Sequence, residues 1–395
     1  MISVEDAVRR IVSAFSPVGA ETVGIGAAAG RVLAEDAVAR MNQPPDPVSS
    51  MDGYAVRAPD APVGATLKVV GSSPAGHPYG GTLRAGEAVR IFTGGVVPEG
   101  ADSIVIQEDT SASDGRVTVN AAAIAMRHIR VAGLDFKTGD AIVKAGRRLS
   151  ARDVSLIAAG DIPAVRVRRR PRVALAATGD ELSPPGNPKK PGGIVASSGY
   201  ALSAMIARWG GETLDLGIIP DKAEAIAAIA DRAAGADLIV TLGGASVGDH
   251  DLVQKALGPR GFELDFWKVA MRPGKPLIFG RLGATPLLGL PGNPVSTLVC
   301  AMLFLKPAVA ALLGTEAQDE AVTMRLAREM KENDGRQDYV RARLTTKDGE
   351  RFAEPFTIQD SSMLSVLARA DALIVRPPRA PAAKIGDAVP VLVLE

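Results

Sequence analysis

Hydrophobic residues recur every three or four positions over residues 3–15, which predicts a helix with one apolar face. Ser3 at its start and Asp6 three residues later are typical of a capped helix N-terminus. A second short helix is predicted over residues 151–159, with Ser150 as its cap. The two helical segments lie far apart in the sequence.

Between these helices the pattern changes to short β-branched runs separated by glycine and proline turns, at residues 67–70, 104–106 and 117–119. No long helical period survives in this region. We therefore predict a β-rich insert at residues 45–140, which interrupts a discontinuous helical domain made of residues 1–44 and 141–170.

From residue 171 the pattern becomes strand, loop, helix, repeated. Short apolar strands are predicted at residues 173–177, 214–219, 238–242 and 286–290. Helices are predicted over residues 199–209 and from Asp221, where Glu224 completes a capping box, to residue 234. This alternation predicts a doubly wound α/β domain over residues 171–315, with a parallel sheet covered on both faces.

After residue 315 the pattern returns to short strands, at residues 322–326, 339–344, 372–375 and 389–394. They predict a compact C-terminal β domain over residues 316–395. The most apolar stretch, residues 295–313, has nearly the length of a membrane span, but Lys306 and Pro307 interrupt it, so we predict a buried helix.

Composition narrows the function classes. The 45 basic and 44 acidic side chains nearly cancel, so no global field favours nucleic acid or an anionic membrane. Cys300 is the single cysteine, which excludes an internal disulfide, and with three scattered histidines it does not make a zinc cage. The start of the chain does not read as a signal peptide, and we expect a cytoplasmic protein.

The first chemical motif follows the predicted strand at residues 286–290. Asn293 is a good helix cap and Pro294 occupies the favoured first helical position, after Pro291 and Gly292. The free N–H groups of such a helix start suit a phosphate or another oxyanion. A helix start without any ligand is the alternative.

The second motif, residues 241–251, also follows a predicted strand. Its glycines allow a ligand to approach the backbone closely, its serine adds a donor, and its two aspartates can hold a hydrated cation. The residues concerned are Gly243, Gly244, Ser246, Gly248, Asp249 and Asp251. It is not a Walker loop, and a plain tight connection is the alternative.

Two further loops carry charge. Lys268, Arg272 and Lys275 lie within eight residues, where three cations near anion-receptive loops favour an electropositive pocket. Asp180 and Glu181 follow the first strand of the α/β region and can help to hold Mg²⁺. Solvated surface charge explains either loop equally well.

The β-rich insert carries two turn-rich motifs, residues 50–55 and 92–102. They place Asp52 and Thr93 at exposed positions, and turn chemistry alone accounts for them.

Taken in order, these motifs resemble those of the MoeA family of molybdopterin molybdenumtransferases. They read Met-Asp-Gly-Tyr, Thr-Gly-Gly, Thr-Gly-Asp-Glu-Leu, Gly-Gly-Ala-Ser-Val-Gly-Asp, Arg-Pro-Gly-Lys-Pro and Pro-Gly-Asn-Pro-Val-Ser, and the resemblance spans about residues 1–375. It implies a multidomain α/β and β fold: a split helical domain, a β-rich insert, a MogA-like doubly wound domain and a C-terminal β-barrel.

The resemblance also implies a cytoplasmic homodimer that takes adenylylated molybdopterin and molybdate, requires Mg²⁺, and releases molybdenum cofactor and AMP. Its partners would be a molybdopterin adenylyltransferase and downstream carriers of the cofactor, with neither nucleic acid nor a membrane involved. The β-rich insert of one subunit would face the α/β domain of the other, and Asp52 and Thr93 would serve either across the dimer or within their own subunit.

Site residues carry over by position. The catalytic set implied is Asp52, Thr93, Glu181, Lys268 and Lys275, and the metal set is Asp180, Glu181 and Asp249. Substrate-binding positions are Asp135, Asp221, Gly243, Gly244, Ser246, Gly248, Asp251, Arg272, Pro291, Gly292, Asn293 and Pro294, with Ser361 or Ser362 near a family serine.

Two positions depart from the family pattern, because Gly95 replaces a common alanine and Arg272 a common lysine. An adenylyltransferase, a CinA-like pyrophosphatase and a non-catalytic dimeric scaffold are the competing functions. The insert motif Met-Asp-Gly-Tyr at residues 51–54 argues against the first two.

Overall fold

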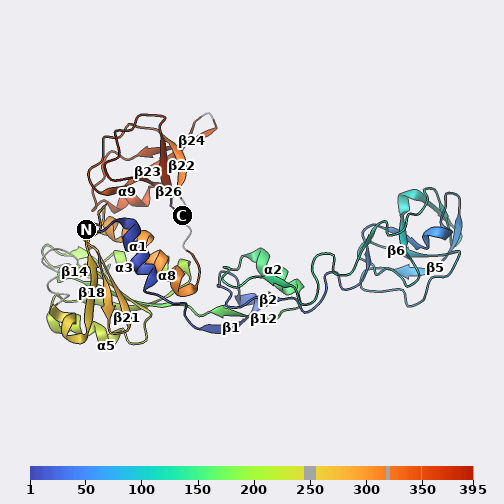
Figure 1. The fold of residues 1–395 in the computed structure, drawn as a ribbon, viewed down its shortest axis with the longest axis horizontal. Coiled ribbons are helices and arrows are strands. Elements are labelled where there is room, and N and C mark those ends of the chain that lie inside the picture. Colours follow the sequence, from blue (N-terminus) through green and yellow to red (C-terminus); the bar gives the residue numbers. More distant parts are fainter. Residues whose placement is uncertain (244–254, 317–320, 348, 395) are drawn as a thin grey trace. The chain divides into compact units, whose positions relative to one another are not determined.

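The computed structural model describes residues 1–243, 255–316, 321–347 and 349–394. Its chain divides into two compact units, one made of residues 1–21 and 168–395, the other of residues 22–167 (Figure 1). The first unit holds an α/β part and a C-terminal β part, and the second holds the β-rich insert.

Helix α1 (Val4–Ser13) begins as predicted, because Oγ of Ser3 accepts a hydrogen bond from the Asp6 N–H at 3.0 Å. Its buried face packs against α8 (Lys306–Leu313), within the first unit. Helix α2 (Ala151–Ala159) lies in the second unit. The two helices thus lie in different compact units, because the apolar face of α1 covers α8. The grouping of residues 1–44 with 141–170 into one domain stays a prediction.

The α/β part is built on one six-stranded sheet with strand order β16-β13-β17-β21-β20-β18. Four strands are parallel, namely β16 (Glu212–Ile219), β13 (Arg172–Thr178), β17 (Leu238–Leu242) and β21 (Thr285–Leu290). Strands β20 (Ile278–Leu282) and β18 (Phe262–Trp267) are antiparallel. The sheet is therefore mixed, whereas the sequence predicted parallel strands alone. The difference arises because a two-residue turn joins β20 to β21, and such a turn can connect only antiparallel strands.

Helix α3 (Ser198–Trp209) ends at Gly210, whose φ of 97° is the left-handed stop that glycine permits. The predicted helix from Asp221 to residue 234 is wrong in detail. The chain instead forms α4 (Ala223–Ala227) and α5 (Ile229–Arg232), and no side chain caps the start of α4.

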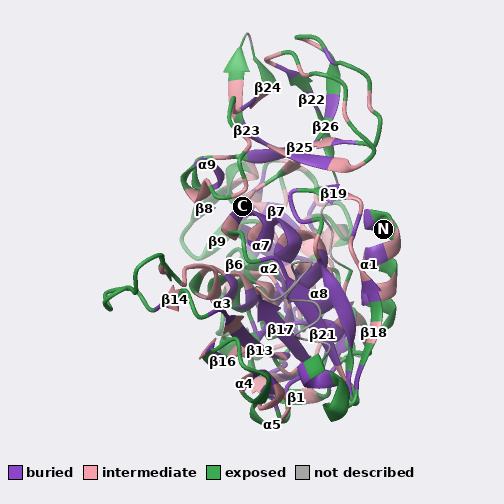
Figure 2. Cartoon of the chain, turned by 90° about the vertical axis from the view of Figure 1, so that its left-hand side faces the viewer, coloured by how far each residue is buried: buried purple, intermediate pink, exposed green. Residues whose placement is uncertain are grey.

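Helix α7 (Pro294–Cys300), the π-helical turn η5 (Ala301–Leu305) and α8 form one continuous helical run. By length and composition this run can cross a membrane, but 67% of its most apolar window is buried inside the protein. Figure 2 shows α7, α8 and the neighbouring strands β17 and β21 in the colour of buried residues. The prediction of a buried core helix is confirmed.

The C-terminal part is a closed five-stranded barrel in the order β23-β24-β22-β26-β25, because β23 pairs with both β24 and β25. This confirms the predicted barrel. Its elements are β22 (Val322–Leu326), β23 (Gln337–Lys347), β24 (Glu350–Pro355), α9 (Leu364–Ala368), β25 (Ala372–Arg376) and β26 (Ala388–Val393). The two-residue strand β19 (Met271–Arg272), from the α/β part, pairs in parallel with β23.

The second unit contains a curled six-stranded sheet in the order β7-β4-β6-β5-β9-β8. The strands are β4 (Gly53–Val56), β5 (Thr66–Ser73), β6 (Glu87–Ile91), β7 (Ser103–Ile106), β8 (Thr110–Ser113) and β9 (Arg116–Val119), with one-turn helices at Ala58–Asp60 and Gln107–Asp109. This confirms the predicted β-rich texture.

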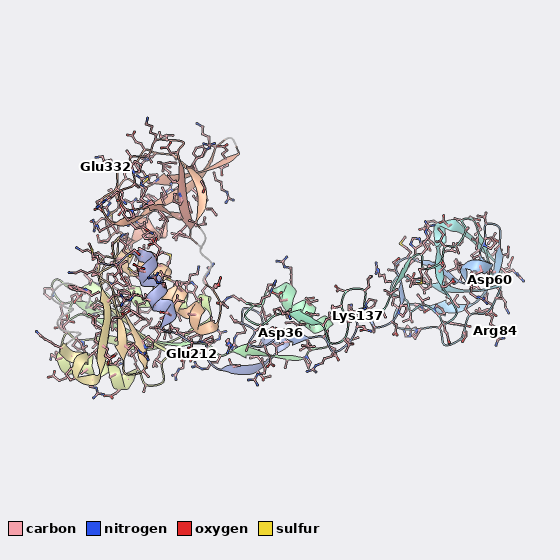
Figure 3. All side chains as sticks on the ribbon, in the orientation of Figure 1. Asp36, Asp60, Arg84, Lys137, Glu212 and Glu332 are labelled. Atoms are coloured by element: carbon pink, nitrogen blue, oxygen red, sulfur yellow. The ribbon has the colours of Figure 1, made fainter. Side chains whose placement is uncertain are left out.

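Shorter elements complete the chain. They are β1 (Ala20–Gly24), Ile25–Ala27, β2 (Ala37–Val38), β3 (Val48–Ser49), β10 (Ile129–Arg130), β11 (Ala141–Val143), β12 (Ala164–Arg168), β14 (Leu182–Ser183), β15 (Ile194–Val195) and Gly258–Arg260. Within the second unit, Asp36 accepts hydrogen bonds from Lys144 Nζ at 2.8 Å and the Ala145 N–H at 2.9 Å. Asp36 is labelled in Figure 3, and its contacts join segments more than one hundred residues apart.

Candidate functional site

A cavity of about 780 Å³ opens in the first unit, at the carboxyl ends of its parallel strands. Its walls come from the loops that follow β13, β17 and β21, from the start of α3, and from two turns of the C-terminal barrel. This is the edge where ligands bind in open α/β sheets. All four predicted motifs of the α/β region therefore reach the cavity, and the glycine-rich motif at residues 241–251 does so through Leu242 and Gly243.

The loop after β21 supplies Pro291, Gly292, Asn293 and Pro294 to the cavity wall. Helix α7 begins at Pro294 as predicted, but the Asn293 side chain does not cap it. Nδ2 of Asn293 instead donates to Oγ of Ser361 at 3.0 Å. The amide of Asn293 is thus turned away from the helix and toward the barrel.

The same helix start is partly occupied by the chain itself. The Val295 N–H donates to the carbonyl oxygen of Ser361 at 3.2 Å. The hypothesis of a helix terminus with all of its N–H groups free therefore holds only in part. Of the two serines considered from the sequence, Ser361 lines the cavity and Ser362 does not.

Gly243 lines the cavity at the end of β17 with a φ of 92°, a left-handed conformation that favours glycine. A Cβ at this position would lie 2.8 Å from the carbonyl oxygen of Thr178, so no other residue fits without displacing backbone. The remaining predicted residues of this motif, Gly244, Ser246, Gly248, Asp249 and Asp251, lie outside the described residues.

Two carboxylates of the α/β part, those of Glu181 and Asp221, line the cavity. Asp180 and Asp221 exchange hydrogen bonds: the Asp180 N–H donates to Asp221 Oδ2 at 3.4 Å, and the Asp221 N–H donates to Asp180 Oδ1 at 3.3 Å. Asp221, predicted as a helix cap, thus ties the loop after β16 to the loop after β13. Across the described ranges, histidine, cysteine, aspartate and glutamate form no group of three or more that could hold a metal ion.

We call residues 268–275 the basic strap. Arg272 and Lys275 line the cavity, whereas Lys268 does not. Nζ of Lys268 lies 3.6 Å from the ring centroid of Trp267, a cation–π contact. The sequence therefore predicted three cavity cations from this segment, and the structure brings two of them to the cavity wall.

The basic strap is held along both edges. On one side the Ile2 N–H donates to the Lys268 carbonyl at 3.3 Å, and the Ala270 N–H donates to the Ile2 carbonyl at 2.8 Å. On the other side the Gln337 N–H of the barrel donates to the Ala270 carbonyl at 2.9 Å. Backbone hydrogen bonds from the N-terminal residue Ile2 and from Gln337 of the C-terminal barrel thus fix the position of the basic strap.

Sequence reasoning missed the barrel residues that complete the wall, which are Arg336, Gln359 and Asp360. They stand on turns that carry no local motif, so only the closure of the barrel brings them to the cavity. Arg336 and Asp334 form an ion pair of 2.9 Å. Hydrogen bonds from the Arg336 side chain and backbone lower the pKa of Asp334 to about 2.

Asp52 and Thr93 lie together in the β-rich insert, within the second unit. Oδ1 of Asp52 accepts from the Thr93 N–H at 2.7 Å and from the Thr93 hydroxyl at 2.9 Å. These hydrogen bonds lower the pKa of Asp52. Asp135, also in the second unit, lines a separate, open cavity of about 490 Å³ beside Phe136 and Lys144.

Three family models match consecutive parts of the chain. The descriptions are "MoeA N-terminal region (domain I and II)" for residues 2–160, "Probable molybdopterin binding domain" for residues 174–311 and "MoeA C-terminal region (domain IV)" for residues 323–394. Together they cover most of the chain.

Similar proteins agree with these models. The chain is 36% identical to a molybdopterin molybdenumtransferase from Nostoc sp. over 90% of its own length and 85% of that protein. It is 34% identical to one from Haemophilus influenzae, over 91% and 90% of the two chains. A crystal structure of a molybdopterin biosynthesis MoeA protein from Pyrococcus horikoshii aligns with a TM-score of 0.87 at 32% identity, covering 100% and 99% of the chains.

Proposed function

Because the chain belongs to the MoeA family of molybdopterin molybdenumtransferases, we propose that its cavity takes adenylylated molybdopterin and molybdate and releases AMP. The chain is a transferase that inserts molybdenum during molybdenum cofactor biosynthesis. The observation that carries the proposal is one cavity whose wall joins the cations Arg272 and Lys275 to the carboxylates Glu181 and Asp221.

The cations serve the anionic groups of both substrates. Molybdate and the linked phosphates carry negative charge, and guanidinium and ammonium groups bind such oxyanions through charge-assisted hydrogen bonds. Arg272, Lys275 and Arg336 line the same wall. We assign Lys275 and the polar groups around Asn293 to the oxyanion end, since Asn293 and Ser361 lie there side by side.

No protein thiol is required, because the pterin dithiolate brings the sulfur ligands of molybdenum. Cys300, the single cysteine of the sequence, is fully buried, and burial raises the pKa of its thiol far above its usual range. In the overall reaction the two sulfur atoms of the pterin dithiol replace one oxygen of molybdate, which takes up the two thiol protons and leaves as water. Another water molecule is consumed when it cleaves the phosphate linkage that holds AMP.

Mg²⁺ fits the carboxylate end of the cavity. This ion binds through one or two carboxylates, with substrate phosphate oxygens and water completing its shell, so it needs no dedicated cluster of protein ligands. Glu181 and Asp221 are the two described carboxylates at this end. When bound, the ion would supply charge neutralisation at the phosphates, and the two side chains would hold it. Asp180 accepts a hydrogen bond from the Asp221 N–H and so fixes the Asp221 loop.

We further propose that the protein works in the cytoplasm as a homodimer, in which Asp52 and Thr93 of the β-rich insert contribute to catalysis. A reaction that adenylylates molybdopterin must precede it, and a carrier or an acceptor enzyme must follow it. The rigid pairing of Asp52 with Thr93 supports a role in positioning, because it fixes an ionised carboxylate at a turn.

The test is turnover with defined substrates. Purified protein is incubated with adenylylated molybdopterin, Mg²⁺ and molybdate, and AMP release and active cofactor are measured. Glu181→Ala is expected to lower AMP release at least about a hundredfold, in the range that loss of a positioned catalytic group gives. The matched control is Glu263→Ala, a carboxylate on β18 outside the cavity wall, which should keep wild-type turnover.

Other outcomes point elsewhere. Formation of adenylylated pterin from molybdopterin and MgATP without molybdate would support the adenylyltransferase instead. A wild-type protein that dimerises and binds neither substrate would support the scaffold. Unchanged AMP release by the Glu181→Ala variant would remove Glu181 from the site.

A further inference from the structure

Arg272 of the basic strap pairs with a carboxylate of the C-terminal barrel. Nη2 of Arg272 donates to Oδ2 of Asp338 in a close ion pair. The side chain of Asp338 is only 10% exposed, whereas that of Arg272 is 50% exposed. The pair therefore joins a buried anion to a cation that reaches the cavity wall.

The register between strands brings the two side chains together. Strand β19 pairs in parallel with β23, so that Met271 lies opposite Gln337 and Arg272 lies opposite Asp338. On the far side of β23, the antiparallel partner of Asp338 is Arg376, whose positive charge also acts on this carboxylate. Asp338 thus lies between two arginines, and among the described residues Oδ1 of Asp338 accepts no hydrogen bond.

A second carboxylate links Arg272 to its neighbour in the cavity wall. Oδ2 of Asp334 lies 3.5 Å from Nη1 of Arg272 and 2.9 Å from Nη2 of Arg336. The side chain of Asp334 is 46% exposed, so this contact is weaker than the buried one. Both arginines that line the cavity therefore share one barrel carboxylate.

These contacts do not use all of the N–H donors of the Arg272 guanidinium. A guanidinium has five N–H donors in a fixed plane. The hydrogen bonds of Arg272 to Asp338, Asp334 and Asn333 all use its terminal Nη atoms. In the described part of the chain, Nε of Arg272 has no acceptor, so this edge of the plane remains for an anion.

We propose that Asp338 is a positioning residue for substrate binding, which holds the Arg272 guanidinium so that its remaining N–H groups face a phosphate in the cavity. Asp334 orients Arg336 in the same way. The inference rests on the proposed function for the identity of the ligand. It also accounts for arginine at position 272: a lysine ammonium has no planar fork to hold a barrel carboxylate and a phosphate at once.

The energetics favour a tight coupling between these residues. Asp338 is the buried partner, so loss of Arg272 would leave its carboxylate with Arg376 alone as a neighbouring cation, which is unfavourable. With Asp338 neutralised, Arg272 would keep only its longer, exposed contacts with Asp334 and Asn333 and would sample several orientations. Phosphate binding must then pay the entropy of ordering this long side chain.

A double-mutant cycle on binding tests the proposal. Adenylylated molybdopterin is titrated with Mg²⁺ and without molybdate, so that the measured Kd does not depend on metal insertion. Asp338→Asn and Arg272→Gln are each expected to raise Kd about tenfold, the effect of one charge-assisted hydrogen bond. The double variant should bind no more weakly than Arg272→Gln alone, because Asp338 acts through Arg272.

The control is Glu350→Gln, which removes another barrel carboxylate, paired with Arg325 at 2.8 Å and outside the cavity wall. Its Kd should equal that of the wild type. If the Asp338→Asn variant does not fold, Asp334→Asn and Arg336→Gln are compared in the same double-mutant cycle. A several-fold rise in Kd for each variant, with no further rise in the double variant, supports the proposal.

Two results would overturn it. The first is a Kd of the Asp338→Asn variant within twofold of the wild-type value. The second is a double variant whose fold-change in Kd equals the product of the two single fold-changes, which is expected if the substitution at Asp338 only loosens the barrel. If the wild type did not bind the adenylylated pterin at all, the proposed function would fail as well. Binding with additive effects would remove only the role of Asp338.

Discussion

At the scale of single residues, the structure confirms some of the helix caps that the sequence predicts and not others. Ser150 caps α2, and Asp153 returns a hydrogen bond to the Ser150 backbone, which completes a capping box. Asn293 makes no side-chain cap at the start of α7, and both Asp221 and Asn293 join neighbouring loops at the cavity. A residue of cap type that follows a strand can therefore either cap the next helix or bind a neighbouring loop, and tertiary contacts decide between the two.

This difference predicts different stabilities for two similar substitutions. Ser150→Ala removes a real cap and should lower the free energy of unfolding by about 1 kcal/mol. Asn293→Ala removes an exposed contact with Ser361 and should lower it by about 0.5 kcal/mol or less. Chemical denaturation of both variants beside the wild type measures the two values. Equal losses would mean that Asn293 supports its helix after all.

The Asp153 carboxylate adds a check on the same cap. Burial raises its pKa, but hydrogen bonds from the Ser150 hydroxyl and backbone, together with the Arg147 side chain, outweigh this and leave the pKa below its ordinary 3.8. A carboxyl whose folded pKa is lowered contributes stability above its unfolded pKa and loses that contribution as the pH falls. The loss in free energy of unfolding caused by Ser150→Ala should therefore be largest at neutral pH and become smaller below about pH 4.

At the scale of elements, the turn after β6 shows why one departure from the family pattern is structural. A Cβ on Gly95 would lie 2.1 Å from the carbonyl oxygen of Ser73 and 2.9 Å from that of Phe92. Both atoms belong to the backbone, so neither can move without shifting the chain at the end of β5 or just after β6. The turn is thus closer packed than an alanine allows, and it carries Thr93, the partner of Asp52.

We predict that Gly95→Ala destabilises the insert by about 1–3 kcal/mol, the range for overpacking. Its melting temperature should fall, and the Asp52–Thr93 contact should loosen with it. Gly80→Ala is the matched control, because no atom lies within 4 Å of a Cβ built there and its φ is not positive. Equal melting temperatures for the two variants would show that the turn can relax.

Much of the element pattern could be predicted from the sequence. Buried strands such as β17 are continuous apolar runs, and their positions follow directly from composition and length. The antiparallel pair β20 and β18 could not be predicted as part of the same sheet, because pairing depends on neighbours distant in sequence. The break between α4 and α5 could not be predicted either, because position 228 is an alanine and not a helix-breaking glycine or proline.

The site was predictable where a motif follows a strand, and not where folding brings two parts of the chain together. Gly243, Glu181 and Asn293 stand directly after strands, and strand ends of one parallel sheet meet at one edge. Arg336 and Asp360 reach the same cavity only because the barrel closes and packs there. No local pattern distinguishes these two from other charged turn residues.

At the scale of the whole molecule, the chain passes between its two units only twice, near residues 21 and 168. Each unit has its own buried clusters, such as Leu287 with Ile239 in the first and Leu33 with Ile157 in the second. Separate cores with few covalent crossings favour separate unfolding.

We therefore predict two heat-absorption peaks in calorimetry of the full chain. Ser150→Ala should shift only the peak of residues 22–167. Val299→Ala, which creates a cavity beside a fully buried position of α7, should shift only the other. One peak that moves with both variants would contradict independent units.

The two hydrogen bonds of Ile2 have a practical consequence for handling the protein. Because its N–H and carbonyl both bind the basic strap, any sequence added ahead of Met1 leaves the fold beside Lys268. A polyhistidine tag there would bring its own metal-binding imidazoles close to a segment that we expect to receive oxyanions. Titrations of molybdate on such a fusion would then report the tag together with the enzyme, so the tag should be cleaved before affinity is measured.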